Sequence, residues 1–118
     1  MQLEATMQLR PETRGGALWV IVEEPRIDAA VAIQFKDRMR EIAAGGPDRV
    51  VLDLSQVGFL DSSGLGAVVA VLKLMGEGRR LELAGLTPTV EKVFRLTRMD
   101  SVFTIHESPE AALGEAGA

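Results

Sequence analysis

Apolar runs alternate with amphipathic segments along the chain, and the runs predict five β-strands. Two runs, ALWVIV and VVLDL, are almost continuously apolar, which is typical of strands covered on both faces of a sheet. Turn residues at positions 13–16 lie between the first two predicted strands and predict a hairpin there. The predicted strands are Leu3–Leu9, Ala17–Glu23, Arg49–Leu54, Arg80–Ala84 and Val102–Ile105.

Four helices are predicted between and after these strands. Asp28 is expected to cap a helix that runs to about Ala44, and residues 64–77 form the second helix. Thr87-Pro88 and Ser108-Pro109 are cap-then-proline signals for a third helix and for a short last one at about residues 110–115. The order β-β-α-β-α-β-α-β-α predicts one α/β domain over residues 1–118, with a mostly parallel mixed five-stranded sheet and about four helices. The end from about residue 114 to 118 is expected to fray.

The composition narrows the class of protein. The 118-residue chain has no cysteine, which excludes disulfides and thiolate zinc sites, and no apolar run approaches the ~18 residues of a membrane span. The N-terminus lacks the layout of a signal peptide, so we expect a cytoplasmic protein. With a net charge of −4, no basic cluster and few aromatic residues, direct nucleic-acid binding is not expected.

The segment FLDSSGLG places two serines side by side at the start of the second predicted helix. Either Ser62 or Ser63 is predicted to be the N-cap, and because both cannot cap one helix, one hydroxyl is left over. The positive potential of a helix start suits an added phosphate as well as a cap. Asp61 would oppose the phosphate's charge of about −1.5 to −2, so phosphorylation could switch this site.

The second predicted helix is apolar around most of its circumference, and glycines interrupt it. Gly64 and Gly66 weaken a helix, and close approach of another backbone, from this chain or from a partner, would explain them. One apolar stripe can face the sheet: Leu65, Val68, Val69, Leu72 and Met75. A second stripe, formed by Ala67, Val71 and Leu74, is covered either by neighbouring helices or by a docking partner.

An enzyme is the weakest interpretation of this chain. A nucleophilic serine needs a base within reach, and the only histidine, His106, is expected to be an ordinary polar residue near the end of the last strand. FLDSSGLG is not a G-x-S-x-G elbow, and no phosphate-loop residues follow its glycines. Scattered carboxylates give no metal-ligand spacing. We therefore expect no catalytic residue, no metal site and no cofactor.

The segment VVLDLSQVGFLDSSGLGAVV resembles the central motif of STAS domains, specifically that of the anti-sigma factor antagonists. In that family a buried strand leads into an Asp-Ser-Ser/Thr-Gly-Leu-Gly loop that opens a helix. Arg26-Ile27-Asp28-Ala29 resembles the loop before the family's first helix, and residues 103–113 fit its closing F-x-I-x-x-S-x-x-x-A-L pattern. The resemblance therefore covers nearly the whole chain.

The resemblance implies a partner-switching regulator. The family's phosphate acceptor corresponds to Ser62, with Asp61, Ser63 and Gly64 shaping the site. The implied partner is a serine-kinase anti-sigma factor with an ATP-binding fold of the histidine-kinase type. It binds the unphosphorylated antagonist, and a PP2C-type phosphatase resets the phosphorylated one. Partner contacts are expected at Arg26, Asp28, Leu65, Ala67, Val71 and Leu74.

Two positions depart from the family pattern. Pro25 stands where a glycine is usual, with Arg26 in place of a common acid, and Arg98-Met99 replaces the usual Gly-Leu after the third helix. These departures affect the identity of the partner more than the fold. The alternative function is that of a non-phosphorylated STAS subunit of a larger assembly, such as a lipid-transport ABC complex, packed through residues 64–77.

Overall fold

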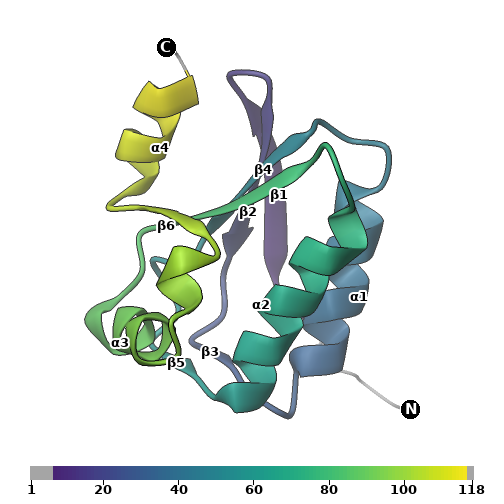
Figure 1. Cartoon of the computed structure of the whole chain (residues 1–118). Helices are drawn as coiled ribbons and strands as arrows, with labels where there is room; N and C mark the ends of the chain where they lie inside the picture. Colours follow the sequence, from purple (N-terminus) through teal and green to yellow (C-terminus); the bar gives the residue numbers. More distant parts are fainter. Residues whose placement is uncertain (1–6, 117–118) are drawn as a thin grey trace.

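A mixed five-stranded sheet forms the centre of the structure, a computed structural model that describes residues 7–116 (Figure 1). The strands are β1 (Leu9–Arg14), β2 (Ala17–Val22), β4 (Arg49–Asp53), β6 (Arg80–Ala84) and β7 (Thr104–His106), in the order β1-β2-β4-β6-β7. Only β1 runs antiparallel to its neighbour; the other three pairings are parallel. The predicted α/β fold with a mostly parallel sheet is confirmed.

The first strand begins later than predicted. Its pairing with β2 runs from Leu9 opposite Val22 to Arg14 opposite Ala17, so the turn consists of Gly15 and Gly16 alone. Both glycines have positive φ angles, 56° and 78°, which close a two-residue hairpin tightly. The hairpin is confirmed, but Thr13 and Arg14 belong to the strand, since an edge strand tolerates polar residues. Residues 3–6 of the predicted strand lie outside the described residues.

The described residues form four α-helices: α1 (Ala32–Ala43), α2 (Ser62–Met75), α3 (Pro88–Leu96) and α4 (Pro109–Ala116). A short 3-10 turn, η1 (Met99–Ser101), follows α3. The Ser108 hydroxyl accepts a hydrogen bond from the Ala111 N–H at 3.1 Å, which confirms the predicted cap of α4. Helix α4 includes residues 114–116, while residues 117–118 lie outside the described part of the chain, and fraying of this end stays a prediction.

The start of α1 differs from the prediction. The helix begins at Ala32 with Val31 at its N-cap position, so Asp28 does not cap it. Instead, the Asp28 side chain accepts a hydrogen bond from the Ala30 N–H at 3.1 Å, and its carbonyl accepts one from the Val31 N–H at 3.0 Å. This arrangement is an Asx turn, which competes with helix capping for the same type of residue.

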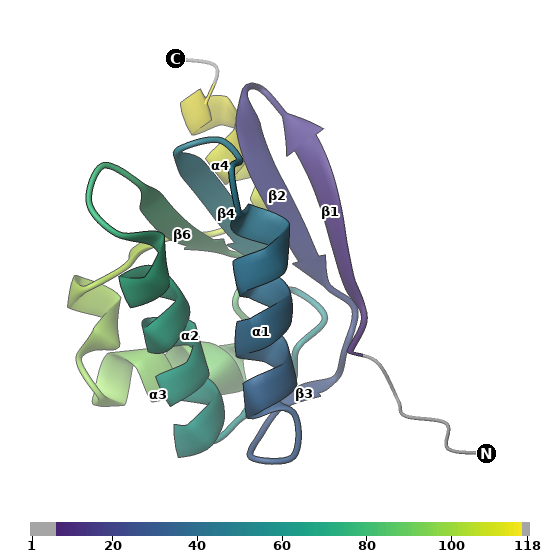
Figure 2. The same cartoon turned by 90° about the vertical axis from the view of Figure 1, so that its right-hand side faces the viewer.

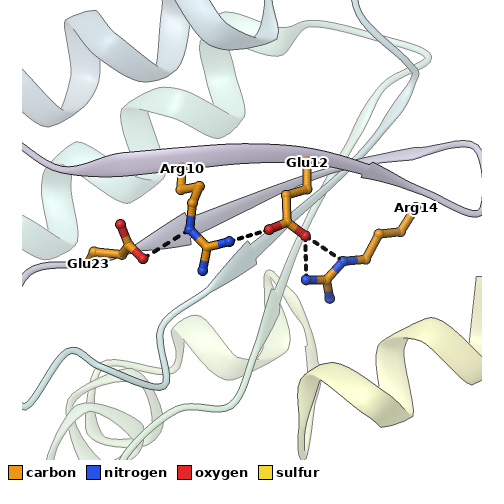
Figure 3. A network of polar contacts seen from close by, with 4 residues as sticks. All are labelled: Arg10, Glu12, Arg14 and Glu23. Atoms are coloured by element: carbon orange, nitrogen blue, oxygen red, sulfur yellow. Dashed lines mark hydrogen bonds and ion pairs between the residues drawn. The ribbon is translucent and has the colours of Figure 1, made fainter.

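The two faces of the sheet are covered differently. Helices α1 and α2 lie side by side on one face and bury the main core, which includes Phe35, Met39 and Val68 (Figure 2). On the other face α4 covers a smaller apolar cluster around Trp19. A chain of ion pairs from Glu23 through Arg10 and Glu12 to Arg14 crosses the same face (Figure 3). The Arg14 guanidinium lies 4.9 Å from the centre of the Trp19 ring. The apolar runs of β2 and β4 are therefore covered on both faces.

A buried ion cluster attaches α4 to the sheet. Arg49 donates to one Glu82 oxygen from Nη2 at 2.8 Å, and the same Nη2 donates to the carbonyl of Ala112 at 3.0 Å. His106 Nε2 lies 2.8 Å from that Glu82 oxygen. Burial acts to raise the pKa of Glu82, but hydrogen bonds from Arg49 and His106 outweigh it and leave the pKa lowered. His106 lies at the end of β7, as predicted for a polar residue near the end of the last strand, and its contact with Glu82 adds a structural role.

Candidate functional site at the start of helix α2

Two short strands, β3 (Arg26–Ile27) and β5 (Phe59–Leu60), bring the site together. They pair in parallel, with Arg26 opposite Phe59 and Ile27 opposite Leu60. The carbonyl of Pro25 accepts hydrogen bonds from Gly58 N–H at 2.9 Å and Phe59 N–H at 3.2 Å. The loop that enters α1 and the loop that enters α2 consequently leave this small sheet side by side.

Asp61, not a serine, caps α2. Its Oδ1 accepts a hydrogen bond from the Gly64 N–H at 2.8 Å, and its Oδ2 accepts one from the Ala29 N–H of the neighbouring loop at 3.1 Å. These backbone hydrogen bonds, the one from Gly64 first, lower the pKa of the Asp61 carboxyl and hold it ionised. The predicted serine cap is wrong because Asp61 is one residue earlier, at the position from which a side chain reaches the third helical N–H.

Both serine hydroxyls are consequently available. Ser62 and Ser63 are the first two residues of α2, and both are exposed. Within residues 7–116 neither hydroxyl takes part in a hydrogen bond. Ser62 therefore presents a free hydroxyl in the positive potential of a helix start, with the Asp61 carboxylate directly before it in the chain.

The two glycines of the motif have different surroundings. A Cβ on Gly64 would lie 1.9 Å from the carbonyl oxygen of Ile27, so β3 approaches the helix too closely for any side chain. A Cβ on Gly66 would meet no heavy atom within 4 Å. The close approach predicted from the sequence is therefore made by this chain at Gly64, whereas no contact among residues 7–116 explains Gly66.

Arg26 and Asp28 lie at the same end of the molecule as the serines. Arg26 Nε donates to Asp28 Oδ2 at 3.1 Å, and the Arg26 guanidinium lies 4.7 Å from the centre of the Phe59 ring. Phe59 is 40% exposed. Asp28 and the Ala29 N–H that binds Asp61 are adjacent in sequence, so these predicted contact residues and the serine loop form one continuous surface. Phe59 was not predicted as part of this surface, although its place in the sequence, three residues before Ser62, could have indicated it.

The second apolar stripe of α2 is covered mostly by α1. Ala67 and Val71 are buried, at 6% and 1% exposure, and only Leu74 is exposed, at 47%. Leu65 is half-buried and packs on the core. Ala67 and Val71 are therefore packed mainly within this chain, and their contact with a partner stays a prediction. Leu74 and the exposed residues beside it are the part of the stripe still open to a partner.

The only histidine in the sequence does not lie near the serine loop. His106 lies on the face of the sheet that α4 covers, so the sheet separates it from α2. No cluster of three or more potential metal ligands occurs among residues 7–116. In the same described range, no helix has the length and apolar character needed to cross a bilayer. The site can thus present a serine to another protein, with the residues around it holding the loop in place.

Comparison with known proteins identifies the family. The STAS domain model matches residues 8–112, and the chain belongs to this family. A Bordetella bronchiseptica relative, named "Putative anti-sigma factor antagonist BtrV", is 33% identical over 87 residues, which cover 73% of this chain and 75% of the relative. The crystal structure of an anti-sigma factor antagonist from Mycobacterium paratuberculosis is 25% identical, with a TM-score of 0.84 over 98% of this chain and 100% of that chain.

A third similarity concerns the fold alone. The Bacillus cell fate determinant SpoIIAA, solved in its phosphorylated form, shares 19% identity and a TM-score of 0.67, over 92% of this chain and 98% of that one. The resemblance drawn from the DSSGLG motif is thereby confirmed at the level of the family and of the fold.

Proposed function

We propose that this protein is an anti-sigma factor antagonist that a serine-kinase anti-sigma factor binds and phosphorylates at Ser62. The observation that carries the proposal is the free, exposed hydroxyl of Ser62 at the first residue of α2, next to a cap that Asp61 already provides. The relative in Bordetella bronchiseptica bears an antagonist name, and a STAS protein of the same fold exists in a phosphorylated form. We place the protein in the cytoplasm, together with its kinase.

The groups needed for phosphate transfer come from two proteins, the antagonist and the kinase. The Ser62 oxygen attacks the γ-phosphorus of ATP, the bond to ADP breaks, and the serine proton passes to a base of the kinase. Asp61 is unsuited to be that base, because its carboxylate is held by the Gly64 and Ala29 amides and its pKa is lowered. The kinase supplies the base, the nucleotide and its magnesium ion.

The phosphate changes the electrostatics of the loop in two opposing ways. The helix start favours an anion, so α2 tolerates the phosphate, while the adjacent Asp61 carboxylate repels it. A partner surface fitted to a neutral serine would then have to bury an uncompensated charge, which costs several kcal/mol. Phosphorylation therefore releases the kinase without unfolding the antagonist, and a PP2C-type phosphatase restores binding.

Mapping the phosphate tests this assignment. The kinase and ATP should add one phosphate to the wild-type protein, and mass spectrometry should locate it on Ser62. Ser62→Ala should abolish labelling, and Ser63→Ala, the matched control on the neighbouring hydroxyl, should retain it. A phosphate found on Ser63, or on neither serine, would show that the assignment is wrong. Absence of labelling combined with co-purification of transporter subunits would instead favour the assembly-subunit alternative.

A further inference from the structure

A hollow between α1 and α2 begins beside the serines. It measures about 180 Å³ and is lined by Ala32, Ile33, Lys36, Ser63, Gly66, Ala67 and Ala70. The two helices lie side by side and face the viewer in Figure 2. The floor of the hollow is made of small residues, so a side chain from outside can come close to the helix backbones.

Two residues at the edge of the hollow are open to contact from outside. Ile33 is 71% exposed, the largest exposed fraction among the large apolar side chains of the described residues. Lys36 forms no ion pair within residues 7–116. An exposed isoleucine and an unpaired ammonium group, one helical turn apart, are complementary to a surface that offers an apolar side chain and a carboxylate.

Gly66 lines the hollow with backbone alone. Glycine in a helix interior is less stable than alanine, and no atom of residues 7–116 lies close enough to require it at this position. Gly64 differs, because the Ile27 carbonyl excludes a side chain there. A partner that approaches the helix at Gly66 would account for the second glycine of the motif.

A second hollow, of about 190 Å³, follows further along the same two helices and includes the exposed Leu74. The charged residues that line the two hollows are Lys36, Arg40 and Arg79, and no carboxylate lines either of them. Asp37 pairs with Arg40 at 3.2 Å from outside the lining. In a chain of net charge −4, the groove between α1 and α2 is thus apolar with basic edges.

We infer that this groove, defined by the lining of the two hollows, binds an amphipathic helix of the kinase that carries acidic residues on its flank. The α1 residues that line the groove span positions 32–43, and about three helical turns, roughly 18 Å, would fill that length. An apolar side chain of the kinase enters the hollow at Gly66, and a carboxylate pairs with Lys36. The inference rests on the proposed function for the identity of the partner. It adds where the kinase is anchored on this protein and which contacts anchor it.

Calorimetric titration with the purified kinase in its ADP form tests the anchor without requiring phosphate transfer. Ile33→Glu should weaken binding at least tenfold, and Leu96→Glu, a control at 70% exposure on α3, should change it less than twofold. Lys36→Glu should weaken binding about tenfold and reduce its salt dependence, whereas Lys92→Glu on α3 should do neither. Equal effects of the groove variants and their controls would overturn the inference.

Gly66→Ala separates a docking role from a structural one. The added methyl group meets open space, so the Tm should rise by about 2–4 °C, while affinity for the kinase should fall at least fivefold. Gly114→Ala on α4, also without atoms near its Cβ, should raise the Tm and leave affinity unchanged. Unchanged affinity of Gly66→Ala would contradict the inference.

The two proposals fail in different ways. If the groove variants bind the kinase normally and Ser62 is labelled, the groove assignment is wrong and the proposed function stands. If the groove variants weaken binding but Ser62 is never labelled, the anchor stands and the phosphorylation switch is wrong. If the wild-type protein does not bind the kinase at all, both are wrong.

Discussion

Replacing Gly64 by alanine tests how closely α2 and β3 are packed. The new Cβ would lie 1.9 Å from the Ile27 carbonyl oxygen, 2.8 Å from its carbonyl carbon and 3.2 Å from its Cγ2. Ordinary contact would require the helix and the strand to separate by more than 1 Å. Because the nearest atoms are backbone atoms paired in the β3–β5 sheet, they cannot move as a flexible side chain could.

The expected change in the free energy of unfolding is the balance of two opposing effects of the new methyl group. Alanine is better than glycine in a helix by about 0.5–1 kcal/mol, whereas overpacking that shifts backbone costs about 1–3 kcal/mol and occasionally more. Separation of the two elements would also strain the Asp61 hydrogen bonds to Gly64 and Ala29. We expect a net loss of about 2–3 kcal/mol in the free energy of unfolding, or about 6–15 °C in Tm.

Urea unfolding followed by fluorescence gives a direct assay. Trp19 is the only tryptophan and is fully buried on the other face of the sheet, so it reports global unfolding without contacting the mutated site. Gly66→Ala, two residues away in open space, is the matched control and should gain about 0.5–1 kcal/mol. The packing argument is refuted if Gly64→Ala is as stable as the wild-type protein or shares the gain of the control.

Three further variants test other parts of the structure by urea unfolding. Arg98 has φ = 65°, a left-handed conformation costly for residues other than glycine, so Arg98→Gly should stabilise by about 0.5–1 kcal/mol and Arg98→Val should destabilise. Arg49→Leu leaves Glu82 buried without its main partner and should cost about 2–4 kcal/mol; a cost below 0.5 kcal/mol would contradict this. Because the folded-state pKa of Asp61 is lowered, its ionised form stabilises the fold above the unfolded pKa of about 3.9, and this contribution disappears as pH falls through the folded value. Asp61→Asn should therefore be less stable than the wild-type protein at pH 7, and the difference in urea midpoint should shrink below about pH 4; a constant difference would refute the assignment.

The central strands β2 and β4 and the cap of α4 could be predicted because their signals are local. β2 and β4 are apolar at almost every position, and Ser108 is followed directly by a proline. β3 and β5 could not be predicted, since two-residue strands show no periodicity and exist only through pairing with each other. The Arg49–Glu82–His106 cluster likewise depends on the register of three strands.

The site could be located from the sequence, but its hydrogen bonds could not. Asp61, Ser62 and Ser63 are all good capping residues, and the choice among them is fixed partly by the N–H of Ala29, which is 32 residues away in the chain. The burial of Val71 depends on how α1 packs, which periodicity on α2 alone does not reveal. Phosphorylation at Ser62 and the partner contacts remain predictions.

The affinity of the kinase for the antagonist before and after phosphate transfer tests the central claim most directly. The wild-type protein is phosphorylated to completion, separated from the kinase, and titrated in parallel with the unphosphorylated protein. The account predicts that one phosphate on Ser62 weakens binding at least a hundredfold, about 2.7 kcal/mol, while the Tm of the free antagonist changes little. Equal affinities of the two forms would contradict a phosphorylation-controlled partner switch.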